Sequence, residues 1–363
     1  MKLIETVQSL IARKKIPQTP QLARGSFGNL KYQDEEFTVT GWMLLPEKQF
    51  DSVTLYIDQR QVENVAVTKR KDVAKAFPFI PNAEQSGFSF SLGRSAEEMK
   101  GTLDIRVVGI SKGKEIAQME TWYRTDLYSC LPTPPPHLIS RVAAHQSPPF
   151  YLLTGMQTYK EFWTTACKHA DPDSITSMLD WGCGCGRVTG FFSTFSGIPR
   201  VFGCDIDAEA ISWCNDNLAP VEFSTVPLYP PTDYADRTFD LIISFSVLTH
   251  LSKENQFAWL KEMHRLLTPG GLFLATIHGE FATRFNFPDK SVKDVLKKGI
   301  VEVEDKRLDD IAPKDYYRGT FQSREYTLKE WSRYFEILEY KERGASNFQD
   351  MVVMKRRIDK HSR

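Results

Sequence analysis

The sequence lacks a charge excess, a long apolar run and a secretory leader, and each absence narrows the range of functions. Lys plus Arg and Asp plus Glu both number 46, so the chain lacks the basic excess of a dedicated nucleic-acid binder. No apolar run approaches the length that spans a membrane. The opening stretch MKLIETVQSLIARKK is charged and amphipathic, without an apolar core or a small-residue cleavage site. We therefore expect neither nucleic acid nor a membrane among its partners.

Cysteine is also scarce. The six cysteines form no C-x-x-C pair and no dense disulfide framework, so a reducing, cytoplasmic location fits best. Charged residues make up 25% of the chain and hydrophobic residues 41%, as is typical of soluble globular proteins. A length of 363 residues favours two domains.

The first part of the chain is predicted to hold a short helix and an all-β domain. Apolar residues at helical spacing predict an amphipathic helix over residues 1–16, within a lead-in segment 1–25. Over residues 26–125, short β-branched and aromatic runs alternate with turn-forming stretches, which predicts an immunoglobulin-like antiparallel sandwich. No Asp, Glu and His residues converge there, which favours an accessory role over a catalytic one.

The second part is predicted to be an α/β domain. Residues 126–150 contain six prolines, a composition that predicts a stiff, extended linker. Over residues 151–363, apolar strands alternate with amphipathic helices, as in a parallel, doubly wound sheet. Asp207 and Ser252 are the expected N-caps of two of these helices. The last two strands, YFEILEYKERG and FQDMVVMKRR, are expected to form a hairpin at a sheet edge.

The stretch LDWGCGCGR follows the first of these strands, and its spacing excludes two common ligand loops. Neither Gly182 nor Gly184 begins a complete G-x-G-x-x-G, so the dinucleotide fingerprint fails at its third glycine. No Lys follows a glycine of this loop, so the phosphate loop G-x-x-x-x-G-K-[ST] fails as well. A metal on Cys183 and Cys185 lacks His or Cys partners nearby, and we expect none.

The pattern that remains is D-x-G-x-G-x-G, with a second acid at the end of the next strand. Open α/β sheets bind ligands beyond the carboxyl ends of their strands, where bare glycine backbone lets a ligand lie close. Asp180 can pair there with a ligand ammonium group, and Asp205 can bind ribose hydroxyls. Ile206 comes next and can pack on a flat base.

Four stretches together, LDWGCGCGR, VFGCDIDAEAI, FDLIISFSVLTHL and LLTPGGLFLATIH, resemble in order the motifs of the class I S-adenosylmethionine (SAM)-dependent methyltransferases, over roughly residues 150–358. The resemblance implies a Rossmann-like, seven-stranded sheet whose last strand inserts antiparallel. It also implies SAM as cofactor and S-adenosylhomocysteine (SAH) as product. The cofactor-binding residues that it implies are Asp180, Gly182, Gly184, Gly186, Asp205, Ile206, Val226, Ser244, Phe245, Tyr151 and Gly155.

The resemblance has one departure and one extension. Val226, Pro227 and Leu228 stand where many relatives carry an acid that binds the adenine amine, so we expect a backbone contact there. GWMLLP, KRKDVAKAFP and SGFSF in the front segment are similar to a β-sandwich module that precedes methyltransferase domains in bacterial polysaccharide and surface-glycan gene clusters. That similarity implies a sugar-like acceptor and allows a protein or glycan to dock on the sandwich.

The candidate catalytic residues are His250, His278 and Glu280. Methyl transfer from a sulfonium is an in-line displacement, in which the protein mainly positions the reactants and excludes water. A hydroxyl acceptor also needs a base, and His suits that task near neutral pH. A His at the position of His250 is common in the family without acting as a base, which favours a structural role for it. His278 and Glu280 are equally consistent with a functional and a structural role.

The insertion at residues 279–325 is predicted to form a lid over the acceptor. Its charged run at 302–310 is expected to be a solvated helix or loop face. The predicted acceptor-binding residues, from the insertion and the last strand, are Tyr316, Tyr317, Gln322, Tyr326, Gln349 and Asp350. The favoured function is O-methylation of a small polar or sugar-like molecule. N- or C-methylation of a peptide- or polyketide-like product stays open, as does a non-catalytic module that binds a glycan or a protein.

Overall fold

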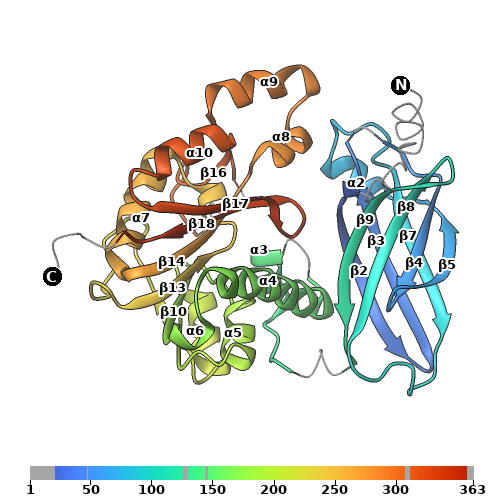
Figure 1. Cartoon of the computed structure of the whole chain (residues 1–363), viewed down its shortest axis with the longest axis horizontal. Coiled ribbons are helices and arrows are strands. Elements are labelled where there is room, and N and C mark those ends of the chain that lie inside the picture. The colour runs from blue at the N-terminus through green and yellow to red at the C-terminus, as the bar shows by residue number, and fades with distance from the viewer. Residues whose placement is uncertain (1–20, 47, 126–129, 144–145, 307–310, 358–363) are drawn as a thin grey trace, which may run out of the picture.

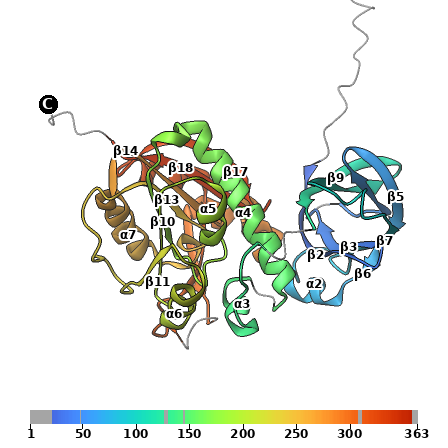
Figure 2. The same ribbon diagram turned by 90° about the horizontal axis from the view of Figure 1, so that it is seen from below.

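The computed structural model describes residues 21–46, 48–125, 130–143, 146–306 and 311–357 (Figure 1). These residues form an N-terminal β domain and a C-terminal α/β domain. Helix α4 (Pro148–His169) runs along the side of the α/β domain that faces the β domain (Figure 2). The helix expected at 1–16 lies outside the described residues. Within those ranges, no helix is long and apolar enough to cross a membrane.

The β domain consists of two sheets, ordered β1-β9-β8-β4-β5 and β2-β3-β7-β6, which confirms that this part of the chain is rich in β-structure. All neighbouring strands pair antiparallel except β1 with β9. Along β3, buried Phe37 and Val39 alternate with half-exposed Thr38 and Thr40, so one face of the strand supplies the core. The elements are β1 (Gln21–Leu22), β2 (Arg24–Gln33), β3 (Glu36–Leu44), β4 (Ser52–Ile57), β5 (Arg60–Ala66), β6 (Thr68–Lys69), α2 (Lys71–Ala76), β7 (Gln85–Gly93), β8 (Leu103–Ser111) and β9 (Lys114–Tyr123).

The α/β domain is built on a sheet ordered β12-β11-β10-β13-β14-β18-β17. The first five strands of this order run parallel, and β18 inserts antiparallel between β14 and β17, so the expected terminal hairpin is present. Every residue of β10 is buried, as expected of a central strand covered on both faces. The strands are β10 (Ser177–Trp181), β11 (Arg200–Asp205), β12 (Glu222–Thr225), β13 (Phe239–Ser244), β14 (Leu267–Ile277), β17 (Glu336–Ala345) and β18 (Gln349–Lys355).

The helices between these strands begin where the sequence predicts. The Asp207 carboxylate accepts hydrogen bonds from two amides at the start of α6, and the Ser252 hydroxyl accepts one at the start of α7. Both N-cap predictions are therefore confirmed. The connecting helices are α5 (Thr189–Phe195), α6 (Ala208–Asn217) and α7 (Lys253–Leu266), with the short 3₁₀ turns η2 (Pro172–Ser174) and η3 (Leu248–His250).

The segment predicted as an extended linker instead contains helix structure. Helix α3 (Pro136–Ala143) lies within it, and α4 begins at Pro148. Proline is favoured in the first turn of a helix, where its missing N–H has no partner to lose. Pro136 and Pro148 begin helices here rather than keep the chain extended, and an ion pair of Arg141 with Asp207 holds α3 against the start of α6.

The insertion folds against both domains. Residues 300–304, at the start of the charged run, form a strand that pairs antiparallel with β16, so the expectation of a helix or loop is wrong there. The cross-strand pair of Val301 and Phe321 stabilises this strand, although the charged residues beside it are exposed. The elements of this region are α8 (Glu280–Asn286), α9 (Asp289–Lys298), β15 (Ile300–Glu304), β16 (Arg318–Gln322) and α10 (Arg324–Trp331).

An apolar cluster joins the two domains. Leu44 and Ile80 of the β domain pack with Phe285 of α8 and Phe348 of the β17–β18 turn. The Phe285 ring lies 5.4 Å from that of Phe77 and 5.8 Å from that of Phe348, measured between centroids. The insertion is therefore fixed by the β domain as well as by the sheet from which it departs.

Phe285→Ala tests this joint. Phe285 is 1% exposed, so its truncation should lower the free energy of unfolding by about 3 kcal/mol through lost burial and a cavity. The measurement is urea denaturation followed by tryptophan fluorescence. Phe79→Ala is the matched control, because Phe79 of the same interface region is 42% exposed. Equal effects of the two substitutions would contradict the role of the cluster.

Candidate cofactor and acceptor site

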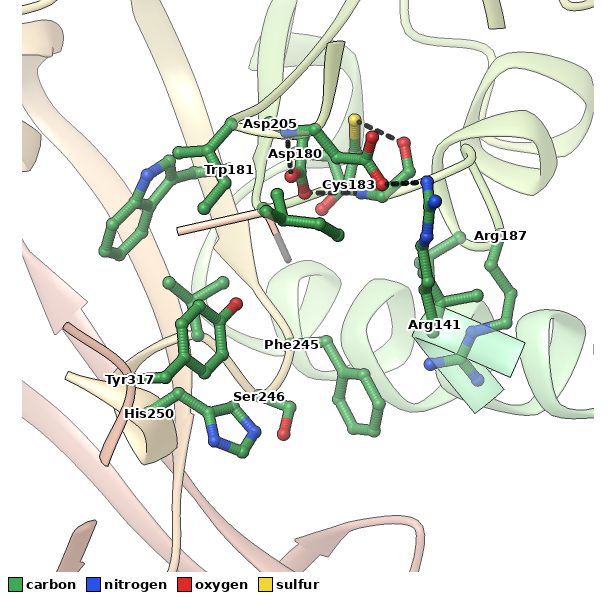
Figure 3. Close-up of a pocket in the computed structure, with 18 of the residues that line it drawn as sticks. Arg141, Asp180, Trp181, Cys183, Arg187, Asp205, Phe245, Ser246, His250 and Tyr317 are labelled. Carbon is green, nitrogen blue, oxygen red and sulfur yellow. Dashed lines mark hydrogen bonds and ion pairs between the residues drawn. The ribbon is translucent and has the colours of Figure 1, made fainter. Parts of the chain in front are cut away.

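A cavity of about 750 Å³ opens where the parallel strands of the α/β sheet end (Figure 3). Its wall is formed by α3, by the loops after β10, β11 and β13, by the insertion, and by the first residue of β2. Asp180 and Asp205 lie on one side of the cavity, and Ser246, His250 and Tyr317 on the other (Figure 3). The site therefore follows the rule that open α/β sheets bind ligands beyond the carboxyl ends of their strands.

The loop after β10 requires glycine at the cavity wall. Gly182 and Gly184 have φ angles of +80° and +53°, a region that side chains rarely adopt. A Cβ at Gly182 would lie 2.1 Å from the nearest methyl of Val247, and one at Gly184 would lie 2.3 Å from a methyl of Val142. Bare backbone is thus needed both for the turn and for the close approach of two neighbouring segments.

Asp180 ends β10 as a buried acid. It is 2% exposed, and its Oδ2 accepts a hydrogen bond of 2.6 Å from the Thr189 hydroxyl. Burial raises the pKa of Asp180 to about 7; the Thr189 hydrogen bond opposes this rise and the nearby Asp205 adds to it. A ligand cation beside this carboxyl would favour its ionised form.

Asp205 ties the loop to the next strand. Its Oδ2 accepts a hydrogen bond of 2.7 Å from the Gly184 amide, and its Oδ1 accepts one of 2.9 Å from the Asp207 amide. Burial raises the pKa of Asp205, against the effect of these two amides. A carboxylate oxygen can accept more than one hydrogen bond, so both oxygens keep capacity for ligand hydroxyls.

Comparison with known proteins identifies this part of the chain. Residues 178–271, which carry the loop, both acids, most of β10 and the whole of β11, β12 and β13, match the family model of a methyltransferase domain. Residues 178–271 therefore carry a methyltransferase domain.

Two curated proteins match part of the chain. The mitochondrial ubiquinone biosynthesis O-methyltransferase of Candida albicans is 28% identical over 123 residues, which cover 31% of this chain and 36% of that protein. A putative methyltransferase of Invertebrate iridescent virus 6 is 25% identical over 91 residues, which cover 25% of this chain and 34% of that protein. The chain thus spans about a third of the length of these relatives.

Two solved methyltransferase structures match slightly more than half of the chain. A SAM-dependent methyltransferase from Methanosarcina mazei is 18% identical with a TM-score of 0.40, and the match covers 54% of this chain and 98% of that one. The N-methyltransferase NodS of Bradyrhizobium japonicum, in complex with SAH, is 14% identical with a TM-score of 0.34, and the match covers 54% and 86% of the two chains.

The predicted cofactor residues of the methyltransferase domain divide into two groups. Seven of them line the cavity: Asp180, Gly182, Gly184, Asp205, Ile206, Val226 and Phe245. The other four lie behind its wall. Gly186 packs against Leu218, Gly155 lets α4 approach the Arg187 carbonyl, and the Tyr151 hydroxyl donates to the Cys185 carbonyl at 2.7 Å. Ser244 is 1% exposed at the end of β13. These four support the loop and the strand end.

The predicted catalytic residues do not converge. His250 lines the cavity, with its Nδ1 3.3 Å from Asp305 Oδ2 and its ring 5.2 Å from that of Tyr317. His278 stacks on Phe321, with ring centroids 5.0 Å apart, and is not among the residues that line the cavity. Glu280 is exposed in the first turn of α8. The structure therefore brings only His250 of the three to the cavity.

Of the predicted acceptor residues, Tyr316, Tyr317 and Gln349 line the cavity. The Tyr316 hydroxyl donates to the Leu228 carbonyl, so it lies on the side of Val226 rather than deep in an acceptor pocket. The remaining three lie elsewhere: Gln322 is buried against Thr327, Tyr326 belongs to α10, and Asp350 accepts hydrogen bonds from Tyr340 and from the Arg343 amide.

A buried polar network shapes the side of the cavity opposite the acids. Gln349 Nε2 donates to Ser246 Oγ at 2.8 Å, and Thr276 Oγ1 donates to Gln349 Oε1 at 2.6 Å. The Ser246 amide donates to Thr276 Oγ1, which holds Ser246 at a φ angle of +66°. This strained residue lies two positions after the end of β13, and strain of this kind is maintained at functional sites.

Sequence reasoning missed three arginines of the cavity wall, Arg24, Arg141 and Arg187. Arg141 of α3 forms ion pairs with Asp207 and Glu209, at 2.9 and 2.8 Å, so it ties the former linker to the start of α6. Arg187 directly follows Gly186, the last glycine of the motif. This adjacency was the only feature of the sequence that could have indicated its place in the cavity wall. Arg24 comes from the other domain, so no local pattern could indicate it.

The cavity fits SAM. Its volume of about 750 Å³ lies within the range of small-molecule sites. The methionine part of SAM matches the buried acid Asp180 and the bare backbone of Gly182 and Gly184. The ribose part matches the carboxylate of Asp205, and Ile206 and Val226 offer apolar contact for the base. The indole of Trp181 stays packed on Trp259, with ring centroids 4.8 Å apart, and so serves the wall of the site.

Asp205→Asn should weaken SAH binding about tenfold to a hundredfold, because charge-assisted hydrogen bonds are lost. The Gly184 and Asp207 amides donate to different oxygens of Asp205, and in Asn one of these oxygens is replaced by an NH2 group that cannot accept. Isothermal titration with SAH measures the change. The control is Asp216→Asn, because Asp216 is exposed on α6, the helix that follows β11. This variant should bind SAH with the affinity of the wild type.

The raised pKa of Asp180 predicts that the affinity for SAH depends on pH. Its pKa of about 7 means that the free site holds a proton at acidic pH, whereas a ligand ammonium favours the ionised carboxylate. Affinity for SAH should therefore rise as pH increases from about 6 to about 8. Because this pKa lies above that of the unfolded chain, the same group makes the stability of the free protein fall as pH rises through 7.

Asp180→Asn should remove most of this pH dependence of affinity. The measurement is isothermal titration with SAH at several pH values. A variant that keeps the wild-type slope would show that another group is responsible.

Proposed function

We propose that the chain is an enzyme that transfers the methyl group of SAM to a hydroxyl oxygen of a small polar or sugar-like acceptor. The observation that carries this proposal is one continuous cavity, with Asp205 and the glycine loop on one side and a His–carboxylate pair at the other. When bound, SAM supplies a methyl group already activated on a sulfonium. The protein has to position the acceptor, exclude water and take up a proton.

His250 is the residue suited to take up that proton. A carboxylate next to Nδ1, here Asp305 at 3.3 Å, favours the tautomer with hydrogen on Nδ1. Nε2 is then the nitrogen that accepts a proton from an acceptor hydroxyl. The sequence favoured a structural role for His250; its place in the cavity wall and its carboxylate neighbour support the catalytic one.

The insertion supports the exclusion of water. Tyr316 and Tyr317 bring two aromatic rings from the segment before β16 to the cavity wall. The Tyr316 hydroxyl holds the loop after β12 through the Leu228 carbonyl. The insertion thus covers the site from the cofactor side to His250, as a lid over a methyl transfer should.

The β domain is proposed to be an immunoglobulin-like sandwich. In chain order β2 to β9 correspond to strands A, B, C, C′, D, E, F and G. The observed sheets β2-β3-β7-β6 and β9-β8-β4-β5 then have the orders A-B-E-D and G-F-C-C′ of that fold. Its role is accessory: it fixes the insertion and closes one end of the cavity.

The proposal is tested with methyl-labelled SAM. Isothermal titration should show binding of SAM and SAH to the purified chain. Incubation with a small-molecule extract should then transfer label to a metabolite, and the NMR shift of the labelled methyl group distinguishes oxygen from nitrogen and carbon. The absence of SAM binding, or a label found only on nitrogen or carbon, would refute the function as stated.

His250→Asn should reduce label transfer by about a hundredfold or more, because a positioned general base contributes that much to the rate. The affinity for SAH should stay close to that of the wild type. The matched control is His169→Asn, since His169 also contacts a carboxylate, Glu339 at 2.7 Å, but lies outside the cavity wall. Undiminished transfer by His250→Asn would assign the histidine a structural role.

A further inference from the structure

Arg24 begins strand β2 of the β domain, yet its side chain lines the cavity of the methyltransferase domain. Its guanidinium carbon lies 4.0 Å from the ring centroid of Phe348 and 5.5 Å from that of Trp42. These two rings, one from each domain, hold the cation in place. Its Nε is buried, and among the described residues neither a hydrogen bond nor an ion pair reaches this guanidinium.

Arg187 provides a second cation on the same wall. It is 7% exposed, and its Nη1 donates to the Thr154 hydroxyl at 3.1 Å, while its guanidinium lies 5.1 Å from the Phe245 ring centroid. Burial lowers the pKa of Arg187, yet within the described ranges no carboxylate forms an ion pair with it. Both arginines also line an adjoining cavity of about 190 Å³ between the two domains.

The acids nearby compensate this charge only in part. Asp180 and Glu161 favour the charged form of Arg187 through space, but within the described residues neither forms an ion pair with it. On the cofactor side, Asp207 is already paired with Arg141. Asp350 is engaged by Tyr340 and by the Arg343 backbone, and Glu120 is an exposed residue of the adjoining cavity. Burial and the neighbouring Arg343 lower the pKa of Arg24 to about 10, so the guanidinium is still protonated at neutral pH. Arg24 is partly exposed, but its Nε is buried without a hydrogen-bond partner. Removing a cation from water costs free energy, and an anionic ligand group would offset that cost.

We propose that the β domain completes the acceptor site: Arg24, together with Arg187, binds an anionic group of the acceptor, a carboxylate or a phosphate. The inference rests on the proposed methyl transfer and narrows its acceptor to polar molecules that carry a negative charge. Arginine suits this task because its planar fork of donors matches both groups. The acceptor then spans the two domains, with its anionic end at Arg24 and its hydroxyl toward His250.

The test uses the full chain saturated with SAH, so that the cofactor's own carboxylate is already in place. Benzoate and phenyl phosphate are titrated against the neutral analogues benzamide and phenol, and calorimetry gives the dissociation constants. We expect at least one anion to bind about tenfold or more tightly than its neutral analogue, as charge-assisted hydrogen bonds predict. The preferred anion shows whether the subsite is built for carboxylate or for phosphate.

Arg24→Met keeps the apolar stem and should abolish this discrimination, while Arg24→Lys keeps the charge and should retain part of it. Arg106→Met is the matched control, because Arg106 of the same domain also stacks on an aromatic ring, Tyr56 at 4.1 Å, but lies away from the cavity. Arg106→Met should keep the wild-type preference for the anionic ligand over its neutral analogue.

The outcomes separate this inference from the function on which it rests. SAH binding without any preference for anions in the wild type would overturn the inference alone, as would full discrimination by Arg24→Met. Equal behaviour of Arg24→Lys and Arg24→Met, with discrimination lost in both, would assign Arg24 a packing role and overturn it as well. Failure of the wild type to bind SAH would overturn the proposed function and this inference together.

Discussion

The hydrogen bond between the Gly184 amide and the Asp205 carboxylate is the interaction around which the site is arranged. It joins the loop after β10 to the end of β11, and it forms only because Gly182 and Gly184 take left-handed backbone conformations. It also satisfies one oxygen of the Asp205 carboxylate, which is partly buried at the cavity wall and would otherwise need water as a donor. Asp180 lies beside it, and the proximity of the two acids contributes to the raised pKa of Asp180.

The opposite side of the cavity depends on a strand that runs against its neighbours. Because β18 is antiparallel to β14, its first residues lie at the edge where the parallel strands end. Gln349 can therefore reach Ser246 after β13 and Thr276 of β14 in one buried network. A fully satisfied network of this kind fixes backbone and side chains more firmly than apolar packing alone.

The two domains share a boundary that is both structural and functional. The cluster around Phe285 fixes the insertion to the β domain, and the same boundary places Arg24 against Phe348 at the cavity. An accessory domain held by buried aromatic contacts has a defined position relative to the sheet. That position allows one of its side chains to form part of the wall of another domain's cavity.

The sequence by itself determined the two domains, the parallel order of β10 to β14, the helix caps at Asp207 and Ser252, and the loop that identifies the cofactor. The domains, strands and caps follow from local spacing, since periodicity and caps are properties of neighbouring residues. The cofactor was implied by the resemblance of four separate stretches to a known family. The tertiary structure decided the features that depend on contacts between residues far apart in the sequence. It placed α3 in the supposed linker, separated His278 and Glu280 from the cavity, paired His250 with Asp305, and brought Arg24 across the domain boundary. No local pattern records these contacts, because packing between elements creates them.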